Sequence, residues 1–203
     1  REEFVPESEH YGYYSNTTDF PFKVEMETDL TIPDNLQLYT FEMGNVNDFQ
    51  YPFRTLTKVS SHFLMNGSSI LPPLALNIKG GDTVLDACSS PGGKALLMLQ
   101  THLPQLVVSN DLMESRANKV RKMMKQYIYD FSSKFDNHRC IIREGDARVT
   151  NEYESYDKVL VDVPCTTDRH AVNENDNNIF QPTRMKERLR LPEMQAAILV
   201  NCM

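Results

Sequence analysis

Residues 84–94, with the sequence Val-Leu-Asp-Ala-Cys-Ser-Ser-Pro-Gly-Gly-Lys, join a short apolar run, a turn and the start of a helix. The apolar run follows Gly80-Gly81-Asp82 and ends before a proline that cannot continue a ladder, as expected for a buried strand of a parallel sheet. Gly92 and Gly93 permit positive φ and a close approach to the backbone. Helix-forming residues follow from Lys94, and free amides at a helix start attract anionic groups. This order predicts a nucleotide-type cofactor at the carboxyl edge of the sheet.

A Pro-Gly-Gly turn by itself is more often a surface loop, so a second signal is needed. The stretch is neither a P-loop nor the Gly-x-Gly-x-x-Gly of a dinucleotide fold. However, a second apolar strand, residues 106–109, ends at Asn110-Asp111. An acidic residue at the tip of the second strand is placed to hold ribose hydroxyls, which favours the cofactor interpretation.

The remaining periodicity predicts an alternation of strands and helices. Strands are expected at 36–41, 138–142 and 158–162. A helix interrupted by Gly67 and Pro72-Pro73 is expected within 56–76, and another after Pro192, from Glu193 to the end. The clearest helix follows Asp111, with one apolar face made of Met113, Ala117, Val120, Met124 and Tyr127. The pattern predicts a doubly wound, mainly parallel α/β sheet. Residues 159–161 are apolar enough to need a neighbouring strand on each side. We therefore expect the sheet in this chain to lack its last strands, so that the domain is incomplete at its C-terminal end.

Composition supports one domain preceded by an acidic extension. Hydrophobic residues make up 40% of the chain, and no apolar run is long enough to span a membrane. Of the net charge of −7, residues 1–31 carry −6, from eight acidic and two basic residues. We therefore expect residues 1–35 to be an extension or linker, and residues 36–203 to be the domain. The four cysteines lack the spacing of a metal site, and Cys88 and Cys140 are expected in the core.

Several motifs together resemble one enzyme family. Residues 84–94, followed by Asn110-Asp111, Gly145-Asp146 and the sequence Asp-Val-Pro-Cys-Thr at 162–166, are similar to the Sun-type RNA cytosine-5 methyltransferases. Residues 161–170, with 177–180 and 186–188, are similar to the mitochondrial ribosomal RNA member in particular. The resemblance covers about residues 36–203 and implies a Rossmann-like fold that uses S-adenosylmethionine. It also implies a role in mitochondrial ribosome assembly, in the matrix.

The same resemblance implies roles for individual residues. The methionine end of the cofactor would lie along Ser90, Pro91, Gly92, Gly93 and Lys94. Other residues would hold the rest of the cofactor: Asp111 the ribose with Arg116 beside it, and Asp146 the adenine. Asp162 would lie between the cofactor and the target base.

A cysteine at residue 165 has a specific use in such chemistry. Carbon 5 of cytosine is a poor nucleophile, so a thiolate adds to carbon 6, and the resulting enamine-like carbon attacks the methyl group. Family members use two cysteines, and Cys165 in Pro-Cys resembles the one that assists release. The attacking cysteine of the family follows a threonine, and no Thr-Cys pair occurs in these 203 residues. We therefore expect these residues alone to bind the cofactor poorly and to be inactive.

RNA contacts require basic side chains, and the chain offers a few near the Pro-Cys loop. The candidates are Arg169, Arg184, Lys186, Arg188 and Arg190, although a solvated face explains the last four equally well. The resemblance implies a transcription-termination-factor-like protein that delivers the RNA. Two other functions stay open: an inactive scaffold that binds RNA or a protein, and a small-molecule methyltransferase. The Pro-Cys motif disfavours the second, since a small-molecule enzyme usually needs no thiol beside the methyl donor.

Overall fold

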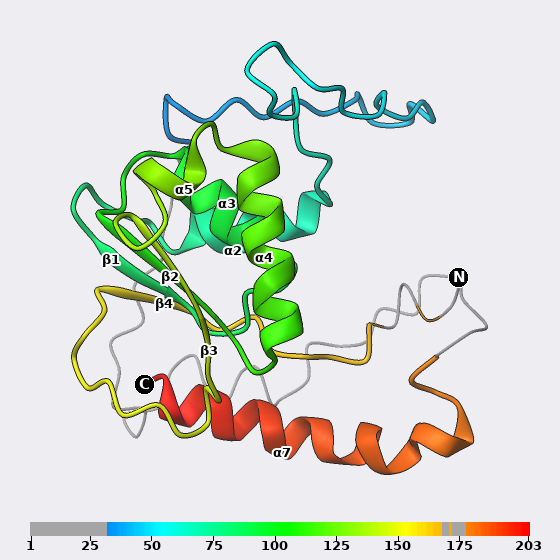
Figure 1. The fold of residues 1–203 in the computed structure, drawn as a ribbon. Coiled ribbons are helices and arrows are strands. Elements are labelled where there is room, and N and C mark those ends of the chain that lie inside the picture. The colour runs from blue at the N-terminus through cyan, green and yellow to red at the C-terminus, as the bar shows by residue number, and fades with distance from the viewer. Residues whose placement is uncertain (1–31, 168–170, 172–177) are drawn as a thin grey trace, which may run out of the picture. The chain divides into compact units, whose positions relative to one another are not determined.

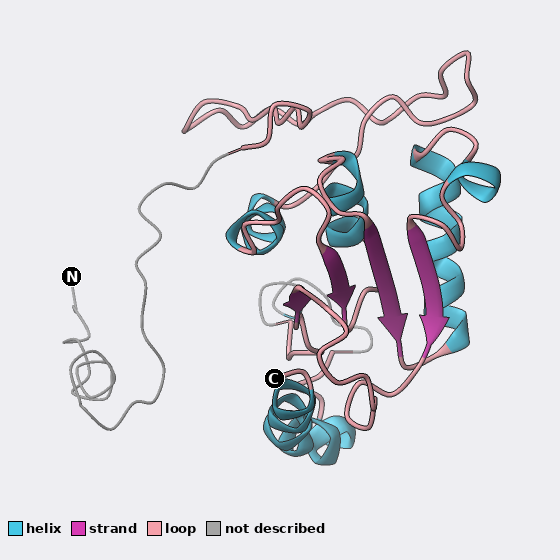
Figure 2. Cartoon of the chain, turned by 90° about the vertical axis from the view of Figure 1, so that its left-hand side faces the viewer, coloured by secondary structure: helices cyan, strands magenta, loops and turns pink. Residues whose placement is uncertain are grey.

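The computed structural model describes residues 32–167, 171 and 178–203. Four parallel strands form its sheet: β1 (Thr83–Asp86), β2 (Leu106–Asp111), β3 (Cys140–Glu144) and β4 (Lys158–Leu160). They are ordered β3-β2-β1-β4 and all neighbours pair in parallel; in Figure 2 the three longer arrows point to the same end. The helices are α2 (Gly67–Ala75), α3 (Gly93–Gln100), α4 (Glu114–Tyr127), α5 (Phe131–Lys134) and α7 (Met185–Asn201), with a 3-10 turn at Pro182–Arg184 (Figure 1).

The sheet buries both of its faces, because alternate residues of a strand point to opposite sides. In β1 and β2, Val84 and Val107 contribute to the core that α3, α4 and α5 cover. The next residues, Leu85 and Val108, pack into a second core with Ile198 of α7. The predicted doubly wound, parallel α/β fold is therefore confirmed, with helices on both faces of the sheet.

The chain before α2 differs from its prediction. Residues 36–41 form no strand; Leu36 instead turns back to Pro33 and buries its side chain against Leu74 and Leu97. The alternating apolar side chains of this segment pack on α2 and α3, and its backbone does not pair with a strand. Only the last part of the region 56–76 is helical, and Gly67 begins the helix instead of interrupting it.

Several element boundaries also move. The third strand begins two residues later than predicted, because His138 and Arg139 donate their amides to the carbonyl of Phe135. Met113 precedes α4 and is exposed, so the buried stripe of that helix is Ala117, Val120 and Met124.

The last helix starts eight residues before the predicted start at Glu193, with Pro192 inside it. An interior proline removes one helical hydrogen bond. Here the helix is held by apolar side chains on both sides of that point, since Leu191 is buried against Ile179 and Ile198 is buried against the sheet. Residues 31–203 form one compact unit, and the proposed division at residue 35 stays a prediction.

Candidate cofactor and catalytic site

The carboxyl ends of the four strands bring the predicted site residues to one edge of the sheet. Asp86 ends β1 and Asp111 ends β2, while Asp146 and Asp162 follow β3 and β4 by two residues each. In a parallel sheet the carboxyl ends lie side by side, and crevices for ligands open there. Four acidic residues that are far apart in the sequence are thus placed along one rim.

The Pro-Gly-Gly turn leads directly into α3, and Gly92 has a backbone conformation that residues with side chains rarely adopt. Gly92 precedes the helix with φ of 106°, and a Cβ there would lie 2.8 Å from the terminal methyl carbon of Met123. A Cβ on Gly93 would lie 3.1 Å from the ring of Phe63. No side chain of the described residues caps the start of α3, so its first amides remain available to an anionic group.

Asp111 connects the second strand to this turn. One oxygen of its carboxylate accepts the backbone N–H of Ser90 at 3.0 Å, and the other accepts Nε of Arg116 at 2.7 Å. Arg116 also donates to the carbonyl of Ser90 at 3.4 Å. The carboxylate is buried and its partners come from two elements, which fixes its direction. The structure thus places Arg116 beside Asp111, in the arrangement that the family resemblance implied.

Lys94 reaches across the site to the end of the fourth strand. Its Nζ lies 2.5 Å from Oδ2 of Asp162, so the first turn of α3 and the residues after β4 are joined by an ion pair. The lysine side chain is mostly covered, whereas the Asp162 side chain is half exposed. Two residues predicted to act at the same cofactor are therefore in contact.

Asp86 belongs to this group, although no role was predicted for it. Only 1% of its surface is exposed, and neither carboxylate oxygen has a hydrogen-bond partner among the described residues. Burial raises the pKa of Asp86 to about 7, and the nearby Asp162 carboxylate adds to the effect. A buried carboxyl group without a partner is rare and often marks a ligand site. Its position as the last residue of a buried apolar strand was the available signal.

Asn110 is a second residue without a predicted role, and it ties three loops together. Its side-chain amide donates to the carbonyls of Ala87 at 3.1 Å and Gly145 at 2.8 Å, while its oxygen accepts Nε of Arg143 at 3.2 Å. A Cβ on Gly145 would lie 2.6 Å from that oxygen, which explains the glycine. Asn110 therefore holds the ends of β1, β2 and β3 at a fixed separation.

Asp146, the residue predicted to face the adenine, lies just after this junction. Its carboxylate forms an ion pair with Arg148 and accepts the backbone N–H of the same residue. The Arg148 side chain and backbone hold the pKa of Asp146 below its usual range. An exposed loop thus presents an ionised carboxylate at the rim.

The Pro-Cys loop follows the fourth strand and exposes its thiol. Cys165 is exposed, and its Sγ accepts the backbone N–H of Thr167 at 3.4 Å. The loop is fixed from α7, because Gln195 donates to the carbonyl of Pro164 at 2.7 Å. Cys140 is fully buried, as expected, and Cys88 is half buried; burial raises the pKa of each to about 12. Among the four thiols, Cys165 is the exposed one.

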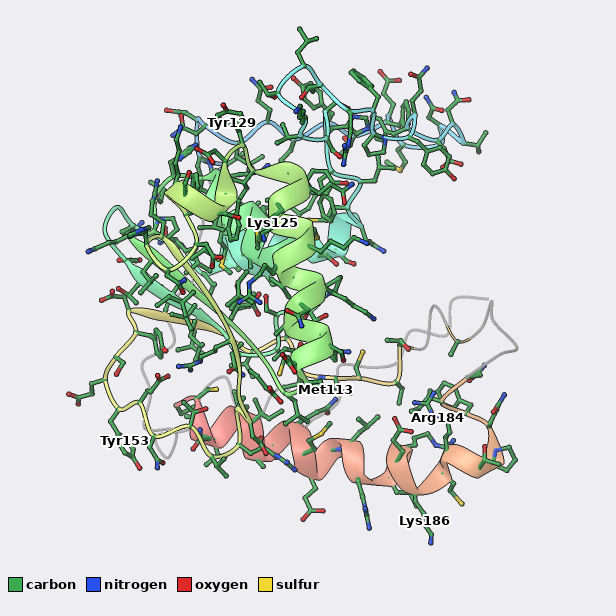
Figure 3. All side chains as sticks on the ribbon, in the orientation of Figure 1. Met113, Lys125, Tyr129, Tyr153, Arg184 and Lys186 are labelled. Atoms are coloured by element: carbon green, nitrogen blue, oxygen red, sulfur yellow. The ribbon has the colours of Figure 1, made fainter. Side chains whose placement is uncertain are left out.

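The residues predicted to bind RNA have different environments. Arg169 lies outside the described residues, whereas Lys186 and Arg190 are exposed. Arg184 forms an ion pair with Glu187, and Arg188 lies over the ring of Phe180 at 5.4 Å. Figure 3 shows Arg184 and Lys186 at the start of α7. Their part in RNA binding stays a prediction.

Within the described residues, no group of three or more His, Cys, Asp or Glu side chains is arranged to hold a metal ion. None of the helices that the structure describes is both long and apolar enough to cross a membrane.

The comparison with protein families identifies the chain. The model of the 16S rRNA methyltransferase RsmB/F family matches residues 73–202, which include every element of the site. The chain belongs to this family. This match confirms the predicted resemblance to RNA cytosine-5 methyltransferases.

Curated relatives extend the match. The chain is 41% identical to the 5-cytosine rRNA methyltransferase NSUN4 of Mus musculus over 165 residues, covering 81% of this chain and 43% of the relative. It is 34% identical to the protein of that description in Caenorhabditis elegans, covering 98% of this chain and 39% of the relative. The chain therefore spans about two fifths of the length of these proteins.

A solved structure of similar fold is described as a methyltransferase homologue from Pyrococcus horikoshii. It has a TM-score of 0.51 and 22% identity, and the alignment covers 69% of this chain and 41% of that one. At this identity the likeness supports the fold alone, which agrees with the parallel sheet described above.

Proposed function

We propose that the protein transfers a methyl group from S-adenosylmethionine to carbon 5 of a cytosine in ribosomal RNA. The observation that carries the proposal is the joint placement of two groups at one sheet edge. One is a carboxylate-rich cofactor rim held by Lys94 and Arg116, and the other is the exposed Cys165 on the adjacent loop. In the family's reaction two thiols act beside the methyl donor, and Cys165 would be the one that assists release.

The residues at the rim fit the charges of S-adenosylmethionine, which supplies an electrophilic methyl group on a positively charged sulfur. The uncapped start of α3 suits the carboxylate of its methionine end. The buried Asp86, without a partner among the described residues, suits a cationic group, and so does Asp162. Asp111 accepts bonds with both oxygens yet keeps lone pairs for ribose hydroxyls.

Cys165 and Asp162 would act on the base. Asp162 lies at the edge shared by the cofactor rim and the Pro-Cys loop, and the ion pair with Lys94 holds its carboxylate in place. A carboxylate there can accept a hydrogen bond from the amino group of cytosine. Cys165 would assist the final step, in which the proton on carbon 5 leaves and the bond between the attacking thiol and carbon 6 breaks.

The wider setting follows from the family resemblance. We propose a mitochondrial matrix location, a role in assembly of the mitochondrial small ribosomal subunit, and a transcription-termination-factor-like partner that delivers the RNA. The two similar proteins named above are described as rRNA methyltransferases, which supports ribosomal RNA as the substrate class.

We further propose that residues 1–203 alone do not turn over. Their cysteines follow Ala87, Arg139, Pro164 and Asn201, so none occupies the Thr-Cys setting of the family's attacking thiol. Measurable methylation of RNA by these residues alone would contradict this part of the proposal.

The reaction can be tested with protein expressed from the complete coding sequence. It would be incubated with small-subunit ribosomal RNA and radiolabelled S-adenosylmethionine, in parallel with Cys165→Ala and, as a control, Cys88→Ala. We expect label in the RNA with the wild type and the control, and a covalent protein–RNA adduct that accumulates with Cys165→Ala. Normal turnover by Cys165→Ala would remove Cys165 from the mechanism.

A further inference from the structure

The solvent face of α4 carries positive charge and no acidic residue along most of its length. From Ser115 to Tyr129 the sequence contains five lysines and arginines and no aspartate or glutamate. Lys119, Lys122 and Lys125 are all exposed, and their spacing of three places them on one side of the helix. An ordinary solvated helix intersperses charges of both signs, whereas Glu114 and Asp130 only flank this run.

These three lysines have no carboxylate partner in the described part of the chain. The ion pairs found there use the arginines at 116, 143, 148 and 184 and Lys94. Unlike those groups, the α4 lysines are free to neutralise an external polyanion. In a chain of net charge −7, such a local surplus indicates a specific anionic partner more than a general need for solubility.

A second stretch without acidic residues lies against the C-terminal end of α4. From Phe49 to Gly81 the sequence contains no aspartate or glutamate, and Arg54 and Lys58 are exposed there. This stretch is joined to α4 by two hydrogen bonds between Ser60 and Gln126, of 2.8 and 3.1 Å. The exposed Arg54 and Lys58 of this stretch therefore extend the basic surface of the helix.

Exposed aromatic rings accompany these cations. Tyr129 is 58% exposed just after α4, and Nζ of Lys134 lies 5.3 Å from its ring centre. Tyr51 and Phe53, beside Arg54, are 90% and 66% exposed. Figure 3 shows Lys125 and Tyr129 near one end of α4, with Met113 at its other end. Lysines with open aromatic rings match the phosphates and unpaired bases of RNA.

We propose that this surface, made of Lys119, Lys122, Lys125, Arg54, Lys58 and Tyr129 and called here the α4 basic face, holds the RNA backbone outside the catalytic site. The inference rests on the proposed function in taking RNA as the substrate. It adds a route for the strand: α4 begins near Arg116 at the cofactor rim, and its 14 residues extend away from that edge. RNA along this face would be anchored while a cytosine enters the site.

The test measures RNA binding and cofactor binding separately. A fluorescently labelled fragment of small-subunit ribosomal RNA would be titrated with the wild type and with the triple variant Lys119→Ala/Lys122→Ala/Lys125→Ala at several salt concentrations. We expect the triple variant to bind about tenfold more weakly, with a log–log salt slope lower by about 2, because each lost phosphate contact removes about 0.7 to 0.9.

Matched controls distinguish charge from shape. The triple Lys→Arg variant keeps the charges and should bind as the wild type does, and Tyr129→Phe should bind more tightly than Tyr129→Leu. The affinity for S-adenosylmethionine should be the same in the wild type and in all of these variants. If the wild type itself did not bind S-adenosylmethionine, that result would count against the proposed function and not against this surface. Unchanged affinity and salt slope in the triple Ala variant would overturn the inference. So would a wild type that binds phosphatidylserine vesicles or an acidic protein but not RNA.

Discussion

At the scale of single residues, the site is defined by which polar groups are satisfied within the protein. Asp111 and Asp162 each have a cationic partner from another element, whereas Asp86 is buried without a hydrogen-bond partner among the described residues. Leaving a buried carboxyl group unpaired costs stability, and the fold tolerates this cost at the carboxyl edge of the sheet.

The raised pKa of Asp86 predicts a pH dependence of stability. Its pKa is about 7 in the folded protein and near 3.8 when unfolded, so between these values the folded state binds more protons. The free energy of unfolding should therefore fall as pH rises from about 4 to 7, by up to about 1 kcal/mol per pH unit. Asp86→Asn should remove most of this slope in urea unfolding, and the exposed Asp34→Asn should keep it. Equal slopes in both variants would show that another group is responsible.

Gly92 offers a prediction about packing. Alanine there must adopt φ of 106° and place its Cβ 2.8 Å from Met123, so Gly92→Ala should lower the free energy of unfolding by about 1–3 kcal/mol. Gly67→Ala, where a Cβ meets nothing within 4 Å, serves as the control and should change stability by less than about 1 kcal/mol. A neutral Gly92→Ala, measured by urea unfolding, would mean that the turn relaxes freely.

At the scale of elements, the strand–turn–helix unit around residues 84–94 and the later strands were predicted from the sequence. Runs of apolar residues that become buried can be recognised without knowing the tertiary structure. The prediction failed where packing overrides local pattern. Leu36 alternates as in a strand but packs on α2 and α3, and Pro192 lies inside a helix stabilised by Leu191 and Ile198. The pairing of Lys94 with Asp162 joins residues 68 positions apart, so only the fold brings it about.

Asn110 gives the prediction at this scale. Asn110→Ala leaves the carbonyls of Ala87 and Gly145 without a donor, and should cost about 1–3 kcal/mol of stability and weaken binding of S-adenosylmethionine. Asn118→Ala, on the exposed side of α4, provides a matched control for both measurements. If calorimetric titration showed full cofactor affinity in a destabilised Asn110→Ala, its role would be confined to folding.

At the scale of the whole molecule, the parallel sheet collects residues from four strands along one edge and covers both faces with helices. The family motifs assigned Gly92, Lys94, Asp111 and Asp162 to one site, and the structure places these four residues at one edge of the sheet. Asp86 and Asn110 were missed, because their importance lies in burial and in contacts between loops. The basic surface of α4 was also missed, because it depends on the segment around Ser60 that lies against the helix.

The most direct test of the central claim is the identity of the methylated nucleoside. Ribosomal RNA treated with protein expressed from the complete coding sequence and S-adenosylmethionine would be digested to nucleosides and analysed by mass spectrometry. The account predicts 5-methylcytidine, and its loss when Asp162 is replaced by Asn. A methyl group on any other nucleoside, or no methylation by a protein that binds both the cofactor and RNA, would contradict it.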